Sequence, residues 1–221
     1  VLQFINWYPQ LVPYHAGRGW ERWAPIVVGP PLLAEVSDYQ LEVRTTEGIV
    51  VASGGPVERR GNAWQFQMQN ARSIAFSASP AYDLRTRTEA GVTIYVFYLH
   101  GHVFGADAVL DAATRALVLF NDHFGHYPYR SLVIAQDAYL SSVAAGGLLL
   151  HSGQGFEDYT GQPDTLLMAL LPLTMAHLWW GQVVGYHPIA EPWMGASLAM
   201  YSEYLYLERY QPDMLDWYWR D

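Results

Sequence analysis

The stretch Met175-Ala176-His177-Leu178-Trp179-Trp180-Gly181 decides the fold of this chain. It ends the longest apolar run, residues 166–180, which also contains Pro172 and is too short to span a bilayer comfortably. We therefore expect a core helix over residues 166–181. Pro172 is expected to kink this helix or to mark its true start, because proline removes one backbone hydrogen bond.

The same stretch matches only the end of a zinc-binding motif. A zinc-peptidase helix carries His-Glu-x-x-His, whose imidazoles at i and i+4 hold the metal while the Glu activates the bound water. Here the five residues are Leu173-Thr174-Met175-Ala176-His177. Leu173 cannot ligate a metal, and the Thr174 hydroxyl stays protonated near neutral pH, so it cannot replace the Glu as a base. Only His177 retains the chemistry of the motif.

The residues after His177 resemble the aminopeptidase N family, the membrane alanyl aminopeptidases of the gluzincin group. In that family the second His is followed by Gln-Trp-Phe/Trp-Gly, and a Glu within Trp-Leu-x-Glu-Gly-x-Ala-x-Tyr is the third zinc ligand. This chain reads Leu178-Trp179-Trp180-Gly181, and its Trp193, Ala199 and Tyr201 keep the later register. The position of the zinc-binding Glu is occupied by Ala196.

Other segments resemble the same family in the same order. Phe124-Gly125-His126-Tyr127-Pro128-Tyr129 is similar to the family's Phe-Gly-x-Tyr-Pro-Tyr, and Asn6-Trp7-Tyr8-Pro9 also occurs in related bacterial sequences. The exopeptidase motif Gly-Gly-Met-Glu-Tyr-Pro-Gly aligns with residues 141–147. Its Glu, which holds the substrate's free amino group in the family, corresponds to Ala144.

Composition excludes several classes of function. The formal net charge is −9, with 12 basic and 21 acidic residues, and every basic residue is Arg. Because the chain lacks a basic stripe, we expect no nucleic-acid partner. There is no Cys, and hence no disulfide or thiolate nucleophile. No transmembrane segment is expected, and no Gly-x-Ser-x-Gly nucleophile elbow is present.

The order of the predicted elements indicates an α+β fold. Short β-prone runs separated by turns fill the first part of the chain, and Val92 to Leu99 forms a strand that enters the second. Residues 106–120 have the spacing of an amphipathic helix, and residues 132–135 and 148–151 form short strands. In the last long helix, begun by Pro192, an apolar stripe is expected to face the core, formed by Met194, Leu198, Tyr201 and Leu205.

The resemblance turns this order into a domain prediction. Residues 1–88 are expected to be part of an N-terminal antiparallel β domain. Residues 89–221 are expected to form a thermolysin-like (gluzincin) catalytic-type domain with a small sheet and helices. Family members carry more sequence on both sides, so we expect the chain to be a piece of a longer protein.

Two further sets of residues are candidates for the site. Trp179, Trp180, Tyr201 and Glu203 are expected to lie near the cleft, although core packing is the commoner role of such aromatic residues. Glu203 lies two helical turns after Ala196 on the same face. A metal site rebuilt from other histidines is an alternative, for which His151 and His187 are the candidates that could approach His177.

The sequence therefore predicts a degenerate gluzincin that keeps the aminopeptidase-like fold and has lost zinc and catalysis. The family cofactor is zinc, but we expect none here, because Leu173 and Ala196 replace two ligands and Thr174 replaces the base. The surviving cleft is expected to bind a peptide or a protein. The alternatives are an active zinc aminopeptidase with a rebuilt metal site and a purely structural module of a larger protein.

Overall fold

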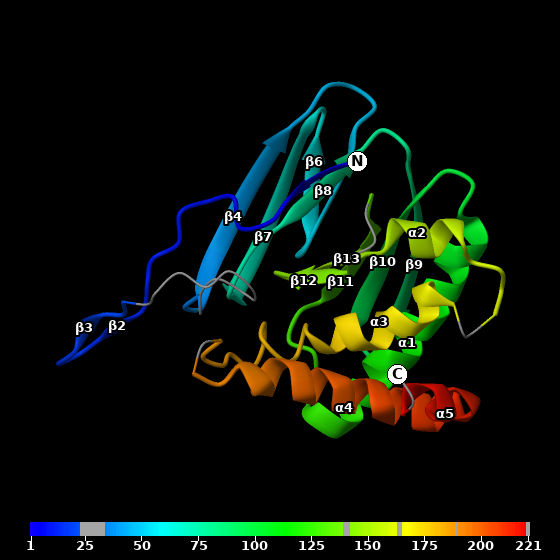
Figure 1. Cartoon of the computed structure of the whole chain (residues 1–221). Coiled ribbons are helices and arrows are strands. Elements are labelled where there is room, and N and C mark those ends of the chain that lie inside the picture. The colour runs from blue at the N-terminus through cyan, green and yellow to red at the C-terminus, as the bar shows by residue number, and fades with distance from the viewer. Residues whose placement is uncertain (23–33, 139–141, 163–164, 189, 220–221) are drawn as a thin grey trace.

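The computed structural model describes residues 1–22, 34–138, 142–162, 165–188 and 190–219. Antiparallel sheets come first along the chain, and a mixed sheet with helices follows (Figure 1). The predicted α+β order is thereby confirmed. No helix in these ranges is both long and apolar enough to cross a membrane.

The first part of the chain forms three small antiparallel sheets. One has the order β4-β7-β6, a second has the order β1-β8-β5, and β2 pairs with β3 in a hairpin that projects from the body (Figure 1). The strands are β1 (Leu2–Phe4), β2 (Tyr14–His15), β3 (Gly19–Trp20), β4 (Ser37–Arg44), β5 (Val50–Ser53), β6 (Val57–Arg60), β7 (Ala63–Ala71) and β8 (Phe76–Ser79).

The second part is built on a five-stranded mixed sheet with the order β12-β13-β11-β10-β9. The three inner strands are parallel to one another, and both edge strands are antiparallel to their neighbours. Their bounds are β9 (Tyr82–Glu89), β10 (Val92–Leu99), β11 (Ser131–Gln136), β12 (Val143–Ala145) and β13 (Leu148–His151). The predicted strands Val92 to Leu99, 132–135 and 148–151 are confirmed. The predicted division after residue 88 falls at the end of β9, which pairs with β10.

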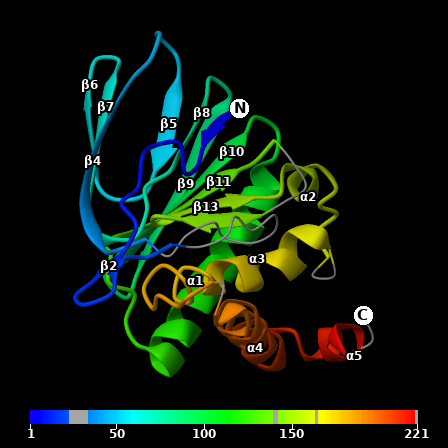
Figure 2. The ribbon, with the colours of Figure 1, turned by 60° about the vertical axis from the view of Figure 1, so that its left-hand side comes forward.

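Side chains from both faces of the mixed sheet are buried. Ile94, Ile134 and Leu149 pack in one core with the helices, whereas Val133 and Leu148 pack in another core against the preceding β region. This alternation follows from the period of two along a strand. The mixed sheet is thus the middle layer, with helices on one side and antiparallel strands on the other (Figure 2).

The helices cover one face of the mixed sheet (Figure 2). Their bounds are α1 (Val103–Phe124), α2 (Gly153–Glu157), α3 (Leu166–Ala176), α4 (Pro192–Tyr210), the 3₁₀ turn η1 (Pro212–Met214) and α5 (Leu215–Tyr218). The amphipathic helix predicted over residues 106–120 is confirmed within α1. Its Val109 and Leu117 are buried, whereas Asp111 and Arg115 are exposed.

The helix predicted over residues 166–181 ends earlier, at Ala176. Beyond it the backbone hydrogen bonds change from the i→i−4 pattern of an α-helix to the i→i−3 pattern of a 3₁₀ turn. The Leu178 N–H, for example, donates to the Met175 carbonyl oxygen at 3.0 Å. Gly181, with φ at 115°, then closes a tight loop in which its N–H donates to the Val184 carbonyl oxygen at 2.8 Å. Pro172 lies inside the helix and does not start it.

The apolar stripe predicted for α4 is only partly buried: Leu205 packs against the helical core, whereas Met194 and Leu198 are partly exposed. Tyr201, a member of the predicted stripe, is 53% exposed. The buried face instead includes Gly195, Ala199, Ser202 and Tyr206. Three of these residues are small, so this face can approach its neighbours closely, and Leu207 is buried on it as well.

Candidate functional site

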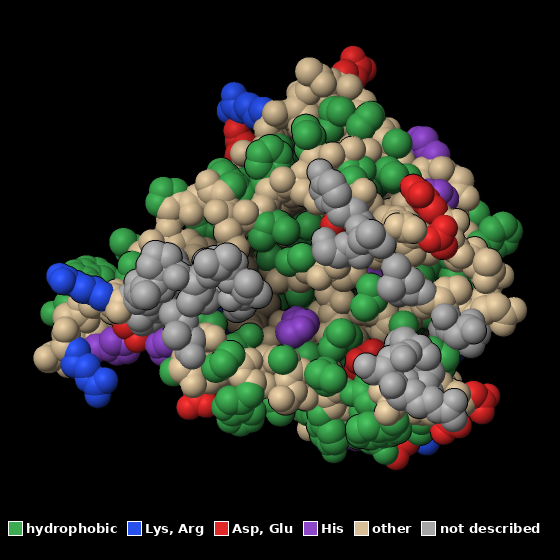
Figure 3. Space-filling view, in the orientation of Figure 1, with side chains coloured by type: hydrophobic (Ala, Val, Ile, Leu, Met, Phe, Trp, Pro, Cys, Tyr) green, Lys and Arg blue, Asp and Glu red, His purple; other side chains and the backbone are tan. Residues whose placement is uncertain are grey.

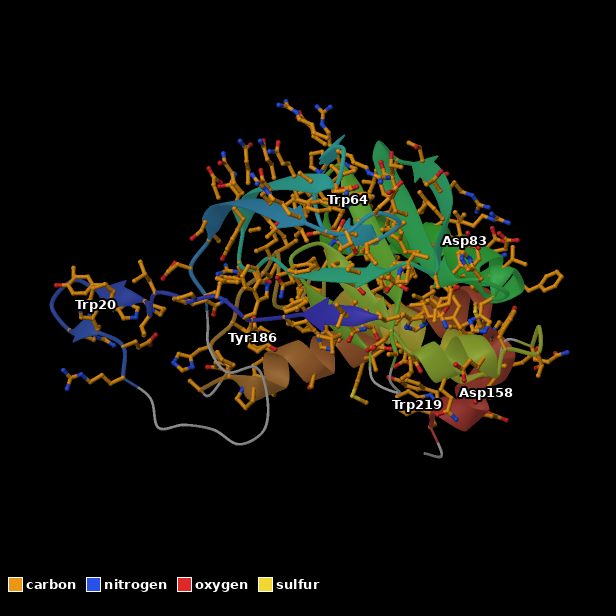
Figure 4. All side chains as sticks on the ribbon, turned by 90° about the horizontal axis from the view of Figure 1, so that it is seen from above. Trp20, Trp64, Asp83, Asp158, Tyr186 and Trp219 are labelled. Carbon is orange, nitrogen blue, oxygen red and sulfur yellow. The ribbon has the colours of Figure 1, made fainter. Side chains whose placement is uncertain are left out.

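A cleft of about 470 Å³ lies between the β region and the helical layer. Its walls include the N-terminal segment at Ile5 and Asn6, residues 142–145 at the sheet edge, and residues 180–182 after α3. Figure 3 shows the surface hollowed near the centre of this face. In Figure 4, Tyr186, a further lining residue, lies beside the N-terminal segment.

The cleft brings together three residues singled out from the sequence. Ala144 in edge strand β12, His177 directly after α3, and Trp180 all line it. These residues come from segments more than thirty positions apart in the chain. Ala144, which the sequence aligned with the exopeptidase motif, and His177, which it aligned with the zinc motif, therefore line the same cavity.

His177 is the imidazole of this cleft. Burial lowers the pKa of His177 below its usual range, while a hydrogen bond with the backbone of Trp180 acts in the opposite direction. Burial is the larger effect, because a charged imidazolium loses hydration when water is excluded. His177 is therefore neutral at neutral pH and contributes no positive charge to the cleft.

The other positions that the sequence aligned with the zinc motif are not among the described residues that line the cavity. Thr174 is 4% exposed, and its hydroxyl donates to the Leu170 carbonyl oxygen at 2.7 Å. Leu173 is partly buried and packs against the helical core. Ala196, on α4, is exposed. The Thr174 hydroxyl is thus satisfied inside its own helix and is not aimed at a ligand.

The two adjacent tryptophans have different surroundings. Trp179 is buried in the helical core, where its Nε1 donates to the Gly125 carbonyl oxygen at 3.0 Å. Trp180 lines the cleft, and its Nε1 donates to Ser202 Oγ at 2.9 Å. One tryptophan therefore anchors the core, whereas its neighbour forms part of the cleft wall.

Tyr201 and Glu203, also singled out from the sequence, are not among the residues that line the cleft. Tyr201 stacks on Tyr204 at the surface, with ring centroids 6.4 Å apart. Glu203 is 7% exposed, and burial raises its pKa to about 7. The described part of the chain gives the Glu203 carboxylate no hydrogen-bond donor.

The histidines proposed for a rebuilt metal site have other partners. His151 is fully buried, with Nε2 2.8 Å from the Leu167 carbonyl oxygen and Nδ1 3.0 Å from Ser142 Oγ. His187 pairs with Glu21, Nε2 to Oε1 at 3.4 Å. Across the described ranges no group of three or more His, Asp or Glu side chains is arranged to hold a metal ion.

Sequence reasoning missed several polar residues of the cleft. Gln182 Oε1 accepts from Ser73 Oγ at 3.0 Å and from the Gly146 N–H at 3.2 Å, so it joins the loop before β8 to the turn between β12 and β13. Arg72 lines the same cavity. Neither Arg72 nor Gln182 belongs to a local motif, and only the long-range fold brings them together.

Comparison with known proteins agrees with the resemblance in the sequence. No family model matches the chain. Aminopeptidase N of Lactobacillus delbrueckii subsp. lactis is 24% identical over 184 residues, an alignment that covers 77% of this chain and 22% of that protein. The chain therefore spans less than a quarter of the length of this relative, to which it is distantly similar.

Proposed function

We propose that this chain is a degenerate gluzincin domain that binds a peptide or a protein segment in its cleft without zinc and without hydrolysis. The carrying observation is the chemistry around His177. Its cleft contains Ala144, and among the described residues no group of three or more His, Asp or Glu side chains could hold a metal. The distant similarity to aminopeptidase N supports the choice of a peptide as the ligand.

The sheet edge suits an extended ligand. Strand β12 is the last strand of the mixed sheet, and residues 142–145 line the cleft. The outer edge of such a strand presents backbone N–H and C=O groups to a peptide that adds to the sheet. In this proposal the main chain of the ligand pairs with β12, and the walls of the cleft select its side chains.

The loss of catalysis is tested by metal analysis and turnover. We expect the purified chain to contain no stoichiometric zinc and to release no product from aminoacyl-arylamide substrates, with or without added zinc. Stoichiometric zinc together with chelator-sensitive hydrolysis would instead establish the active enzyme with a rebuilt metal site. A catalytically active relative serves as the positive control for the assay.

The binding role is tested with a cleft-filling variant. Val143 lines the cleft and is 37% exposed, so Val143→Trp adds bulk there without entering the core. The matched control is Thr86→Trp, at an exposed position of β9 outside the cleft lining. In NMR titrations with short peptides we expect Val143→Trp to abolish binding and Thr86→Trp to retain it. A folded wild-type chain that binds no peptide would favour the purely structural module.

A further inference from the structure

The charge of the cleft is unusual for a site with an aminopeptidase-like ancestry. None of the described residues that line it is an Asp or a Glu. Because His177 is neutral, Arg72 is the one formally charged side chain among the described lining residues.

Arg72 is held in place by backbone contacts. Its Nη1 donates to the Ala34 carbonyl oxygen at 2.9 Å. Its guanidinium lies directly over Gly185, where an added Cβ would stand 2.4 Å from Cζ and 2.5 Å from Nη2. Only a residue without a side chain leaves room for this arrangement. The guanidinium is therefore oriented before any ligand arrives.

The guanidinium of Arg72 keeps a donor that has no acceptor among the described residues. Its Nε is buried without an acceptor, and in the described part of the chain no carboxylate lies within ion-pair distance of the guanidinium. An unpaired donor on a charged group loses the hydration it would have in water. Because Arg72 lines the cleft, an anionic group bound there would offset this cost by compensating the charge of the guanidinium.

The polar groups near Arg72 favour a ligand that carries a hydrogen-bond acceptor. The Gln182 side chain uses its oxygen to accept from Ser73 and Gly146, so its amide NH₂ is the end that remains for a ligand. The carboxylate of Glu21, which pairs with His187 next to the lining residue Pro188, has Oε1 3.5 Å from His15 Nε2 and 3.4 Å from His187 Nε2. The acidic net charge of the chain thus does not extend to the cleft lining.

We infer that the cleft binds a carboxylate group of its peptide ligand through Arg72. The inference rests on the proposed peptide-binding function and adds the class of ligand. It reverses the preference expected from the family resemblance, in which a Glu at the position of Ala144 holds a positively charged amine. The carboxylate can belong to the C-terminus of the ligand or to an acidic side chain.

Binding of four peptides distinguishes a C-terminal carboxylate from an acidic side chain as the group that Arg72 binds. The first is N-acetyl-tetraalanine with a free C-terminal carboxylate, and the second is the same peptide with a C-terminal amide. The third carries a Glu within an acetylated, amidated chain, and the fourth is tetraalanine amide with a free amine. NMR titration of the wild-type chain should show about tenfold tighter binding of the first or third peptide than of the second, as for charge-assisted hydrogen bonds. Whichever of the two binds tighter identifies the source.

Variants assign the preference to Arg72. Arg72→Gln should remove the difference between acidic and amidated peptides while leaving their shared affinity. Arg72→Lys should keep part of the difference, because the charge remains but the planar fork is lost. Arg44→Gln, at an exposed Arg paired with Glu42 on β4, is the control and should change nothing.

The outcomes separate the two proposals. Binding of all four peptides with equal affinity, or tightest binding of the free-amine peptide, overturns the carboxylate preference but keeps the peptide-binding function. If no peptide binds to the folded wild-type chain, both proposals fall. A preference for acidic peptides that persists in a folded Arg72→Gln variant overturns the role of Arg72.

Discussion

Trp180 Nε1 donates a hydrogen bond to Ser202 Oγ at 2.9 Å, which ties the loop after α3 to the middle of α4. Ser202 is fully buried and its own hydroxyl donates to the Leu198 carbonyl oxygen at 2.7 Å. Trp180 also lines the cleft. The serine hydroxyl thus links the packing of α4 to the position of a cleft wall.

Replacing Ser202 with Ala should destabilise the fold by about 1 kcal/mol. The Trp180 N–H loses its acceptor, which costs about 1–2 kcal/mol, and the better helix propensity of Ala offsets part of this. Ser197→Ala is the matched control, because Ser197 is exposed on the same helix. Urea denaturation measures both variants. Equal midpoints for the two would show that the Trp180–Ser202 bond contributes nothing.

Gly146→Ala should destabilise far more than Gly61→Ala. Both glycines have positive φ, at 51° and 62°, so each substitution places Ala in the left-handed region at about 1–2 kcal/mol. At Gly146 the added Cβ would also lie 2.2 Å from the Ser73 carbonyl oxygen, whereas nothing lies within 4 Å at Gly61. The difference in unfolding free energy between the variants measures this contact, and a difference near zero would contradict it.

Glu203 should make the fold less stable as pH rises. Its folded-state pKa is about 7, above the ordinary value of 4.5, so the folded state holds more protons than the unfolded state between these values. Stability is then lost as pH increases from 4.5 to 7. Glu203→Gln should be more stable than the wild type by about 1–2 kcal/mol at pH 8 and equal to it at pH 4.5, allowing for partial solvation. Thermal unfolding at both pH values decides the point.

His151 should make the fold less stable as pH falls, which is the opposite of the effect of Glu203. Burial lowers its pKa to about 4 from the ordinary 6.5, so below pH 6.5 the unfolded state takes up a proton that the folded state resists. Stability falls on acidification from pH 6.5 to 4, by up to about 3 kcal/mol. In the wild type this loss overlaps the gain from protonating Glu203. Glu203→Gln should therefore reveal a steep acid dependence that the wild type hides, and His151→Gln should abolish it.

The sequence predicted best where the local pattern and the tertiary environment agree. The strand Val92 to Leu99 matches β10 at both ends, because alternation and β-branched residues coincide with a central position in the sheet. The helix after Leu166 was extended too far, since an apolar run does not reveal that Trp179 enters the core while Trp180 faces the cleft.

The missed residues of the cleft depend on contacts between distant segments. Arg72 lies in the β region and is placed by Gly185, more than a hundred positions later. Hydrophobic periodicity contains no information about such a contact. The orientation of α4 was missed for a related reason. Gly195 meets the Tyr186 ring, whose hydroxyl would stand 2.0 Å from an added Cβ, and the spacing of apolar residues along the helix does not reveal this contact.

The register of the zinc motif can be tested by rebuilding it. In the double variant Leu173→His/Ala196→Glu, two imidazoles stand at i and i+4 with His177, and a carboxylate occupies the third position of the family pattern. The degenerate-site proposal predicts that this variant binds one zinc ion, although of the three positions only His177 is among the described residues that line the cleft. At a hundredfold excess of zinc over its dissociation constant, the ion should stabilise the fold by about 2.7 kcal/mol.

Two controls accompany the rebuilt site. His177→Ala in the double variant should abolish zinc binding, and the wild type should gain no stability from zinc. Metal analysis after gel filtration and thermal unfolding with and without zinc provide the readouts. Thr174 is left unchanged, because a Glu at this buried position would place a charge in the core. A folded double variant without zinc affinity would show that Leu173, His177 and Ala196 are not in the ligand register of the family, and the degenerate-site proposal would fail with it.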